Sequence, residues 1–160
     1  MVACDVVEEE GLSLGPFSAN TRRRIEELLP PLAIRTNPVD MAFARNEEAF
    51  EDTVRCLLDD RNVDALIVFL LHHPFMTPQR IAGPLLRQKQ KTAKPIVLCA
   101  NSPRGFIEDE VAELESRGIP VYPLPERAVR ALKGLFEYGE IRERGTGQGA
   151  WSKKNAKPET

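Results

Sequence analysis

The chain has 160 residues, of which 42% are hydrophobic and 29% charged, and its formal net charge is −2. This length is typical of one compact domain with its own core. The near-neutral charge argues against a dedicated nucleic-acid-binding protein, and no apolar run reaches the roughly 18 residues that a membrane-spanning helix needs. The opening residues lack the pattern of a secretory signal, and the three widely spaced cysteines predict reduced thiols. We therefore expect a cytoplasmic protein.

The first sixty residues predict helices joined by short loops. Three helices are indicated by the spacing of apolar residues and by capping side chains: residues 2–10, from Ser18 or Asn20 to Leu29, and 47–59. Leu12–Leu14 is a possible short strand, and residues 32–40 are expected to be irregular, with a turn-rich loop at Asn37–Asp40.

From residue 65 onwards, predicted strands alternate with predicted helices. Ala65–Leu71 is uninterruptedly apolar, as is typical of a strand covered on both faces. The elements expected after it are a helix from Thr77 to about Gln90 kinked at Gly83–Pro84, a strand over 95–100, a helix ending at Gly118, a strand over 119–122 and a final helix after Pro125. This alternation predicts right-handed βαβ units and a parallel sheet. We expect one α/β domain over residues 1–144 and a flexible Gly- and Lys-rich tail over 145–160.

Ligands of open α/β sheets bind beyond the carboxyl ends of the strands, so the loops at that edge hold the candidate site residues. These candidates are Asn37, Asp40, His72, His73, Asn101 and Ser102. Asp40 could order its own turn or face the crevice. The two histidines could ligate a metal, shuttle protons or be phosphorylated, but no companion ligand stands at a spacing such as H-x-x-x-H. We therefore predict no metal site and prefer a structural or incidental role for them.

A further candidate site is the start of the helix at Thr77-Pro78. The first turn of a helix has free N–H groups and a positive dipole end, so it can hold a phosphate without a cationic side chain. An ordinary helix cap is the alternative and, from the residues alone, the better interpretation. The sequence has no G-x-G-x-x-G, G-x-x-x-x-G-K-[ST] or G-x-S-x-G motif, so the usual nucleotide-binding and hydrolase signals are absent.

Several segments in a fixed order resemble one family. They are E-E-G-L-S-L-G-P-F-S, R-R-I-E-E-L-L-P-P-L-A, N-P-V-D, L-L-D-D-R-N-V-D-A-L-I-V, F-M-T-P, K-P-I-V and I-P-V-Y-P-L-P-E-R-A-V-R-A-L. Over residues 3–143 the chain resembles the flavodoxin-like, succinyl-CoA-synthetase-type domain of the NDP-forming acyl-CoA synthetases, the acetyl-CoA synthetase (ADP-forming) family.

The resemblance implies a three-layer flavodoxin-like (Rossmann-like) fold with helices on both faces of a parallel sheet. It also implies a part in a reversible ligase that converts acyl-CoA, ADP and phosphate to acid, CoA and ATP. In this family the phosphoryl group travels on a histidine of another domain, and the matching helix start here would contact it through Met76 and Thr77. CoA, ADP or ATP, and Mg²⁺ would serve the complete enzyme, whose CoA-binding and ATP-grasp domains would be partners.

Two departures from the family limit this expectation. The family's His-Thr-Gly or His-Ala-Gly context does not occur, so neither His72 nor His73 is expected to carry the phosphoryl group. Relatives begin this domain with a strand like V-A-I-V-T-N-A-G-G-P, which is not found before Val2. We therefore expect a gap in the sheet between Leu12–Leu14 and Ala65–Leu71, with dimerisation or strand exchange at the exposed edge.

The chain by itself is not expected to complete a catalytic cycle. Two alternatives stay open from the sequence. One is a stand-alone binding or regulatory module for a phosphorylated metabolite, and the other is a non-catalytic interaction remnant.

Overall fold

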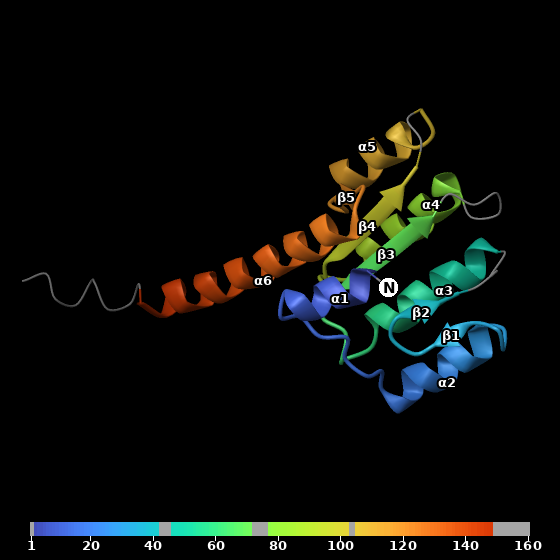
Figure 1. Ribbon diagram of the computed structural model, residues 1–160, viewed down its shortest axis with the longest axis horizontal. Coiled ribbons are helices and arrows are strands. Elements are labelled where there is room, and N and C mark those ends of the chain that lie inside the picture. The colour runs from blue at the N-terminus through green and yellow to red at the C-terminus, as the bar shows by residue number, and fades with distance from the viewer. Residues whose placement is uncertain (1, 42–45, 72–76, 103–104, 149–160) are drawn as a thin grey trace, which may run out of the picture.

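The structure is a computed structural model that describes residues 2–41, 46–71, 77–102 and 105–148. Figure 1 shows its elements, which in chain order are α1 (Val2–Glu9), α2 (Ala19–Leu28), β1 (Ile34–Arg35), β2 (Val39–Asp40), α3 (Glu47–Leu58), β3 (Leu66–Leu71), α4 (Pro78–Lys89), β4 (Ile96–Asn101), α5 (Glu108–Ser116), β5 (Val121–Tyr122) and α6 (Pro125–Gln148). None of the described helices contains an apolar stretch that could cross a membrane.

A three-stranded parallel sheet in the order β3-β4-β5 forms the centre of the fold. β3 and β4 pair along their whole length, from Leu66 opposite Ile96 to Leu71 opposite Asn101. β5 pairs with the middle of β4. Because both long strands are apolar without interruption, both faces of the sheet require a covering layer. The predicted α/β class with a parallel sheet is confirmed.

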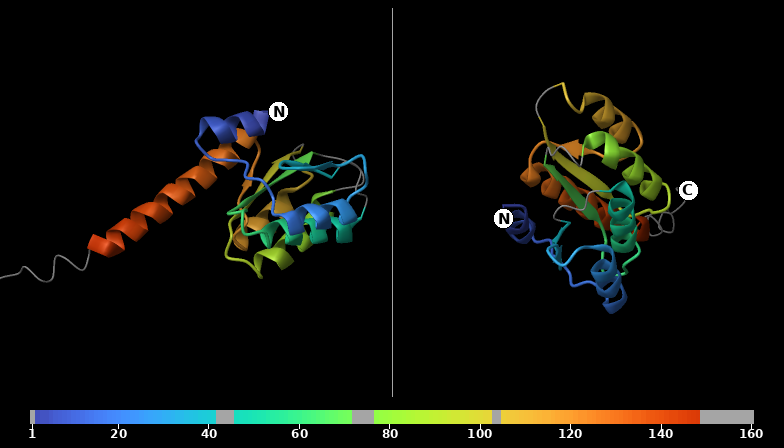
Figure 2. Two further views of the ribbon diagram at one scale, coloured as in Figure 1. Left: turned by 90° about the horizontal axis from the view of Figure 1, so that it is seen from below. Right: turned by 90° about the vertical axis from the view of Figure 1, so that its right-hand side faces the viewer.

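Helices cover both faces of this sheet (Figure 2). Alternate residues of β4 point to opposite faces: Leu98 packs into a core formed with α3, α4 and α5, whereas Val97 and Cys99 pack against Ala128 and Leu132 of α6. α1 lies beside α6 on the second face, where its Val6 and Val7 join Val129 in a smaller core. The result is the expected three-layer arrangement.

A buried carboxylate joins α2 to the loop that leads into β3. Asp60 accepts hydrogen bonds from the Ser18 backbone N–H at 2.8 Å and from the Asn62 backbone N–H at 2.9 Å. Burial raises the pKa of Asp60, but these hydrogen bonds outweigh burial, and the pKa lies below its usual value. The Lys94 ammonium group donates to the carbonyl oxygens of Leu58 and Asp60, both at 2.7 Å. These bonds position the start of β3 relative to α2 and α3.

The first forty residues differ from the prediction in two places. Leu12–Leu14 is not a strand: it has no strand partner among the described residues, and the Leu12 N–H bonds back to Val7 O at 2.9 Å. Residues 32–40, expected to be irregular, contain the antiparallel pair β1–β2. Its two-residue strands are too short to leave an alternating pattern in the sequence.

One helix, α4, covers its predicted range, and another, α6, is longer than predicted. α4 continues through Pro84, which is fully buried, so packing offsets the lost backbone hydrogen bond. α6 runs to Gln148, four residues into the predicted tail, and residues 149–160 lie outside the described part of the chain. A glycine destabilises a helix interior by only about 1 kcal/mol. The cost of Gly145 is therefore too small to end a helix that has already formed.

Candidate functional site

The carboxyl edge of the sheet brings together the start of α4 and the loop before α5 (Figure 1). The Gln79 side-chain amide donates to Phe106 O at 3.5 Å, which links the two segments. Asn101 ends β4 at this edge and is exposed. The Ser102 hydroxyl is buried and has no hydrogen-bond partner among the described residues. Three of the predicted candidates, Thr77, Asn101 and Ser102, thus follow the strand ends as expected.

The N-terminus of α4 lacks the groups that usually neutralise a helix start. Thr77 is the N-cap residue, with φ −89° and ψ 159°, but its side chain makes no capping hydrogen bond. Pro78 occupies the first turn and has no N–H. The Arg80 N–H bonds to Thr77 O at 3.0 Å, and no acidic residue lies in the first turn. The positive end of the helix dipole is therefore not offset by the helix's own side chains.

The other helix starts differ in this respect. In α5 the Glu108 carboxylate accepts hydrogen bonds from the N–H groups of Gly105 and Ile107, and two further acids follow it. Asn46 caps α3 through the Ala49 N–H at 2.7 Å, and Ser18 caps α2. α6 has Glu126 in its first turn. Among α2 to α6, α4 is the helix whose described N-terminus has neither a capping side chain nor an acid, which favours an anion there.

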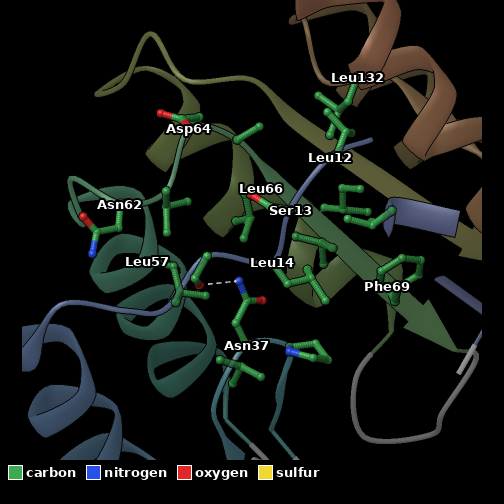
Figure 3. A pocket seen from close by; sticks show the side chains of 18 of the residues that line it. Leu12, Ser13, Leu14, Asn37, Leu57, Asn62, Asp64, Leu66, Phe69 and Leu132 are labelled. Carbon is green, nitrogen blue, oxygen red and sulfur yellow. Dashed lines mark hydrogen bonds between the residues drawn. The ribbon is translucent and has the colours of Figure 1, made fainter. Parts of the chain in front are cut away.

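Of the remaining predicted site residues, three lie outside the described part of the chain and two lie away from this edge. Met76, His72 and His73 lie outside the described residues. Asn37 and Asp40 belong to the β1–β2 hairpin, where the Asn37 amide donates to Gly15 O at 3.1 Å, the dashed line in Figure 3. Both border a large cavity that Thr77, Asn101 and Ser102 do not line. The sequence analysis assigned all of these residues to one crevice. The structure instead places Asn37 and Asp40 at the cavity and Thr77, Asn101 and Ser102 at the carboxyl edge of the sheet.

This cavity lies between β3 and the segment 12–15 and has a volume of about 1080 Å³ (Figure 3). Among the described residues, β3 is the outer strand of its sheet. Most lining side chains are apolar, and the charged ones are acidic: Asp40, Asp64, Glu140 and Glu143. No described lining residue is Lys, Arg or His. The lining of the cavity therefore disfavours anionic ligands, whereas the start of α4 favours an anion.

Sequence reasoning missed Glu140 and Glu143 as cavity residues, because charged residues late in the last helix are typical of a solvent-exposed face. A run of solvent-exposed charges gives no signal that it borders a distant strand. Two of the three cysteines, Cys56 and Cys99, are buried, and burial raises the pKa of both thiols. Within the described residues, no three His, Cys, Asp or Glu side chains come together to hold a metal ion.

The chain is similar to proteins of one family. The family model for the Ligase-CoA domain matches residues 1–139. Two relatives from Pyrococcus furiosus are the alpha subunits of ADP-forming acetate–CoA ligases II and I. The first is 32% identical over 142 residues, covering 86% of this chain and 31% of the relative. The second is 29% identical over 150 residues, covering 88% of this chain and 30% of the relative.

Solved structures support the same fold. A protein of Pyrococcus horikoshii matches with a TM-score of 0.73 and 29% identity, over 82% of this chain and 31% of that one. A dinucleotide-forming acetyl-coenzyme A synthetase of Ca. Korarchaeum cryptofilum, solved in complex with phosphate and ADP, matches with a TM-score of 0.77 and 24% identity, over 88% and 31%. This chain thus spans about a third of the length of the relatives it matches. Because the family model covers most of its residues, the chain belongs to the Ligase-CoA domain family.

Proposed function

We propose that this chain is the domain of an NDP-forming acyl-CoA synthetase that offers a helix N-terminus to a phosphohistidine carried by another domain. The complete enzyme would convert acyl-CoA, ADP and phosphate to acid, CoA and ATP, reversibly. Its relatives among the alpha subunits of ADP-forming acetate–CoA ligases support this proposal. Because the chain spans about a third of those subunits, the proposal assigns CoA, ADP or ATP and Mg²⁺ to CoA-binding and ATP-grasp domains that act as partners.

The observation that carries the proposal is the unneutralised N-terminus of α4 at the carboxyl edge of the sheet. A phosphohistidine from a partner domain would place its phosphoryl oxygens against the N–H groups around Thr77, including that of Met76 in the proposed contact. Pro78 contributes no N–H. The chain would hold and orient the phosphoryl group, and the acidic residues of the large cavity would disfavour the same group there.

The test uses inorganic phosphate as the probe and two substitutions at one position. Thr77→Asp places a carboxylate where it can accept the N–H bonds of the first turn, so phosphate affinity should fall at least tenfold. The same change should stabilise the fold by up to about 1 kcal/mol, because Asp is a favourable N-cap residue. Thr77→Ser is the control and should bind phosphate as the parent does.

Binding is followed by the amide NMR shifts of Thr77 and Gln79 during a phosphate titration, and stability by urea unfolding. Unchanged phosphate binding by the Thr77→Asp variant would show that α4 is not the anion site. Formation of acetyl-CoA from acetate, CoA and ATP by the isolated chain would contradict the assignment of the other steps to partner domains.

A further inference from the structure

We infer that the second half of α6 is a dimerisation surface, on which two copies of this chain pack their α6 helices against each other in antiparallel orientation. The contact centres on Tyr138 and Ile141, which are 58% and 59% exposed and do not line the cavity beside β3. This surface lies away from the α4 N-terminus (Figure 1), so the inference does not depend on the function proposed above. It includes residues beyond 139, where the match to the family model ends.

The second half of α6 projects from the body of the domain (Figure 2). The first half is anchored by the buried Leu132, and Phe136 is the last α6 residue that packs against a described core cluster. The helix then continues over residues 137–148. A free helix shorter than about 12–15 residues is only marginally stable in water, and Gly139 and Gly145 lower the helix propensity further. A packing partner on this half of α6 would supply the missing stabilisation.

The exposed face of α6 has the residue spacing of a coiled-coil seam. Its members recur at alternating intervals of four and three residues, and none of them is buried: Arg127, Ala131, Gly134, Tyr138, Ile141 and Gly145. The opposite side of the helix supplies the core residues. Because two seams of equal period interlock along their length, the same face of a second copy is a matching partner.

The antiparallel register places large side chains opposite each other and small residues beside them. With Tyr138 opposite Ile141 of the second copy, Gly134 lies opposite Gly145, and residues 131–148 overlap over about 27 Å. A Cβ at either glycine would meet nothing within 4 Å, so packing within the domain does not require a glycine there. In the dimer the two glycines leave room for the tyrosine ring. The Arg142 guanidinium lies 5.9 Å from the centroid of that ring and helps to hold it in place.

The charges beside the seam are complementary in this register. Glu137 comes next to Arg144 of the second copy, and the two-fold symmetry repeats the pair. Within its own helix, Glu137 lies 4.0 Å from Lys133 and Arg144 lies 3.7 Å from Glu140, so both are held only by long, exposed contacts. A parallel dimer would instead bring Arg127 against Arg127 of the second copy, and such like charges disfavour that orientation.

Sedimentation equilibrium of the 160-residue chain measures the dimer directly. We expect reversible dimerisation with a Kd between about 1 μM and 1 mM, because one helix pair is a small interface. Ile141→Glu places a carboxylate in the seam and should weaken dimerisation at least tenfold. Leu32→Glu is the control: it changes a leucine that is 78% exposed on another surface and should leave the Kd unchanged. Circular dichroism checks that both variants keep their helices.

Charge reversal tests the predicted ion pair. Glu137→Arg and Arg144→Glu should each weaken dimerisation about tenfold, because each replaces two attractive pairs with two repulsive ones. The double variant should return the Kd to within about threefold of the parent value. A parallel dimer would not show this restoration.

Disulfide cross-linking determines the orientation without altering Tyr138 or Ile141. Gly134→Cys and Gly145→Cys are prepared in a Cys4→Ser background, since the other two native cysteines are buried. We expect a mixture of the two variants to cross-link at least fivefold faster than either variant alone. This measurement decides the question if Ile141→Glu loses helix content.

Three results would overturn the inference. The first is a chain that stays monomeric up to about 1 mM. The second is a dimer that a folded Ile141→Glu variant leaves intact, because the contact would then lie on another surface, such as the edge of the sheet. The third is cross-linking of each cysteine variant with itself as fast as in the mixture.

Discussion

Replacing Asp60 with alanine tests the polar connection between α2 and the start of β3. The substitution removes both oxygens that accept the N–H groups of Ser18 and Asn62. A hydrogen bond to a charged group contributes about 1.5–3 kcal/mol, and a buried donor without a partner costs about 1–3 kcal/mol. Ser18 is only half-buried, so water can replace part of this loss. We therefore expect a loss of about 3 kcal/mol in the free energy of unfolding, or about 6–12 °C in Tm for a chain of this length.

The matched control is Asp59→Ala, which removes the neighbouring but exposed carboxylate at the C-terminus of α3. We expect it to change stability by less than about 0.5 kcal/mol. Both variants are compared with the parent by urea unfolding and by thermal unfolding followed with circular dichroism. If Asp60→Ala lies within about 0.5 kcal/mol of Asp59→Ala, the hydrogen bonds to Asp60 do not stabilise the fold and the reasoning fails.

The same pair of variants predicts a pH dependence. Burial raises the pKa of Asp60, but its hydrogen bonds outweigh burial and lower it below the unfolded value, which is about 3.9. A carboxyl group with a lowered folded-state pKa contributes stability that is fully present above the unfolded value and is lost as the pH falls towards the folded value. The stability difference between parent and Asp60→Ala should therefore shrink below about pH 4, whereas a difference that grows on acidification would reverse the sign.

Two further pairs of substitutions test the backbone and the core. Gly118 has a φ of +84°, so Gly118→Ala should lower the free energy of unfolding by about 1–2 kcal/mol. Gly134 lies in α6, where a Cβ meets nothing within 4 Å, so Gly134→Ala should raise it by about 0.5–1 kcal/mol. Urea unfolding should therefore show changes of opposite sign, and changes of the same sign would contradict this reasoning. Leu85→Ala empties a fully buried position and should cost about 2–5 kcal/mol, while Leu135→Ala, at a residue 48% exposed, should cost well under half as much by the same measurement.

The elements that the sequence predicted correctly are those with a strong local pattern. β3 and β4 are uninterrupted apolar runs, and α3 combines a capping Asn46 with an apolar stripe. Errors occurred where the local pattern is weak. A strand at Leu12–Leu14 was expected from two leucines, but an extended segment becomes a strand only when a partner backbone lies beside it.

In the candidate site, too, features with a local sequence pattern were predicted and features that depend on the tertiary structure were not. Thr77-Pro78 was recognisable as a helix start, because cap and first-turn proline are neighbours in the sequence. The sequence did not show that the Thr77 side chain makes no capping hydrogen bond. Nor did it show that the Glu108 carboxylate accepts a hydrogen bond from the Ile107 N–H at the start of its own helix, α5. Both depend on side-chain direction, which the surrounding backbone decides. Asn37 was assigned to the carboxyl edge from its loop, yet its amide bonds to Gly15 beside the cavity.

The sequence by itself determined the alternation of strands and helices, and hence the parallel α/β class, because apolar periodicity reports which faces of an element are buried. It also led us to predict a gap in the sheet beside Ala65–Leu71. Only the tertiary structure decided that this gap is an apolar cavity with acidic residues in its lining, open along the edge of β3. Residues from α1, α3, β3, α6 and several loops line that cavity, and contacts between segments so far apart in the chain leave no periodic trace in the sequence.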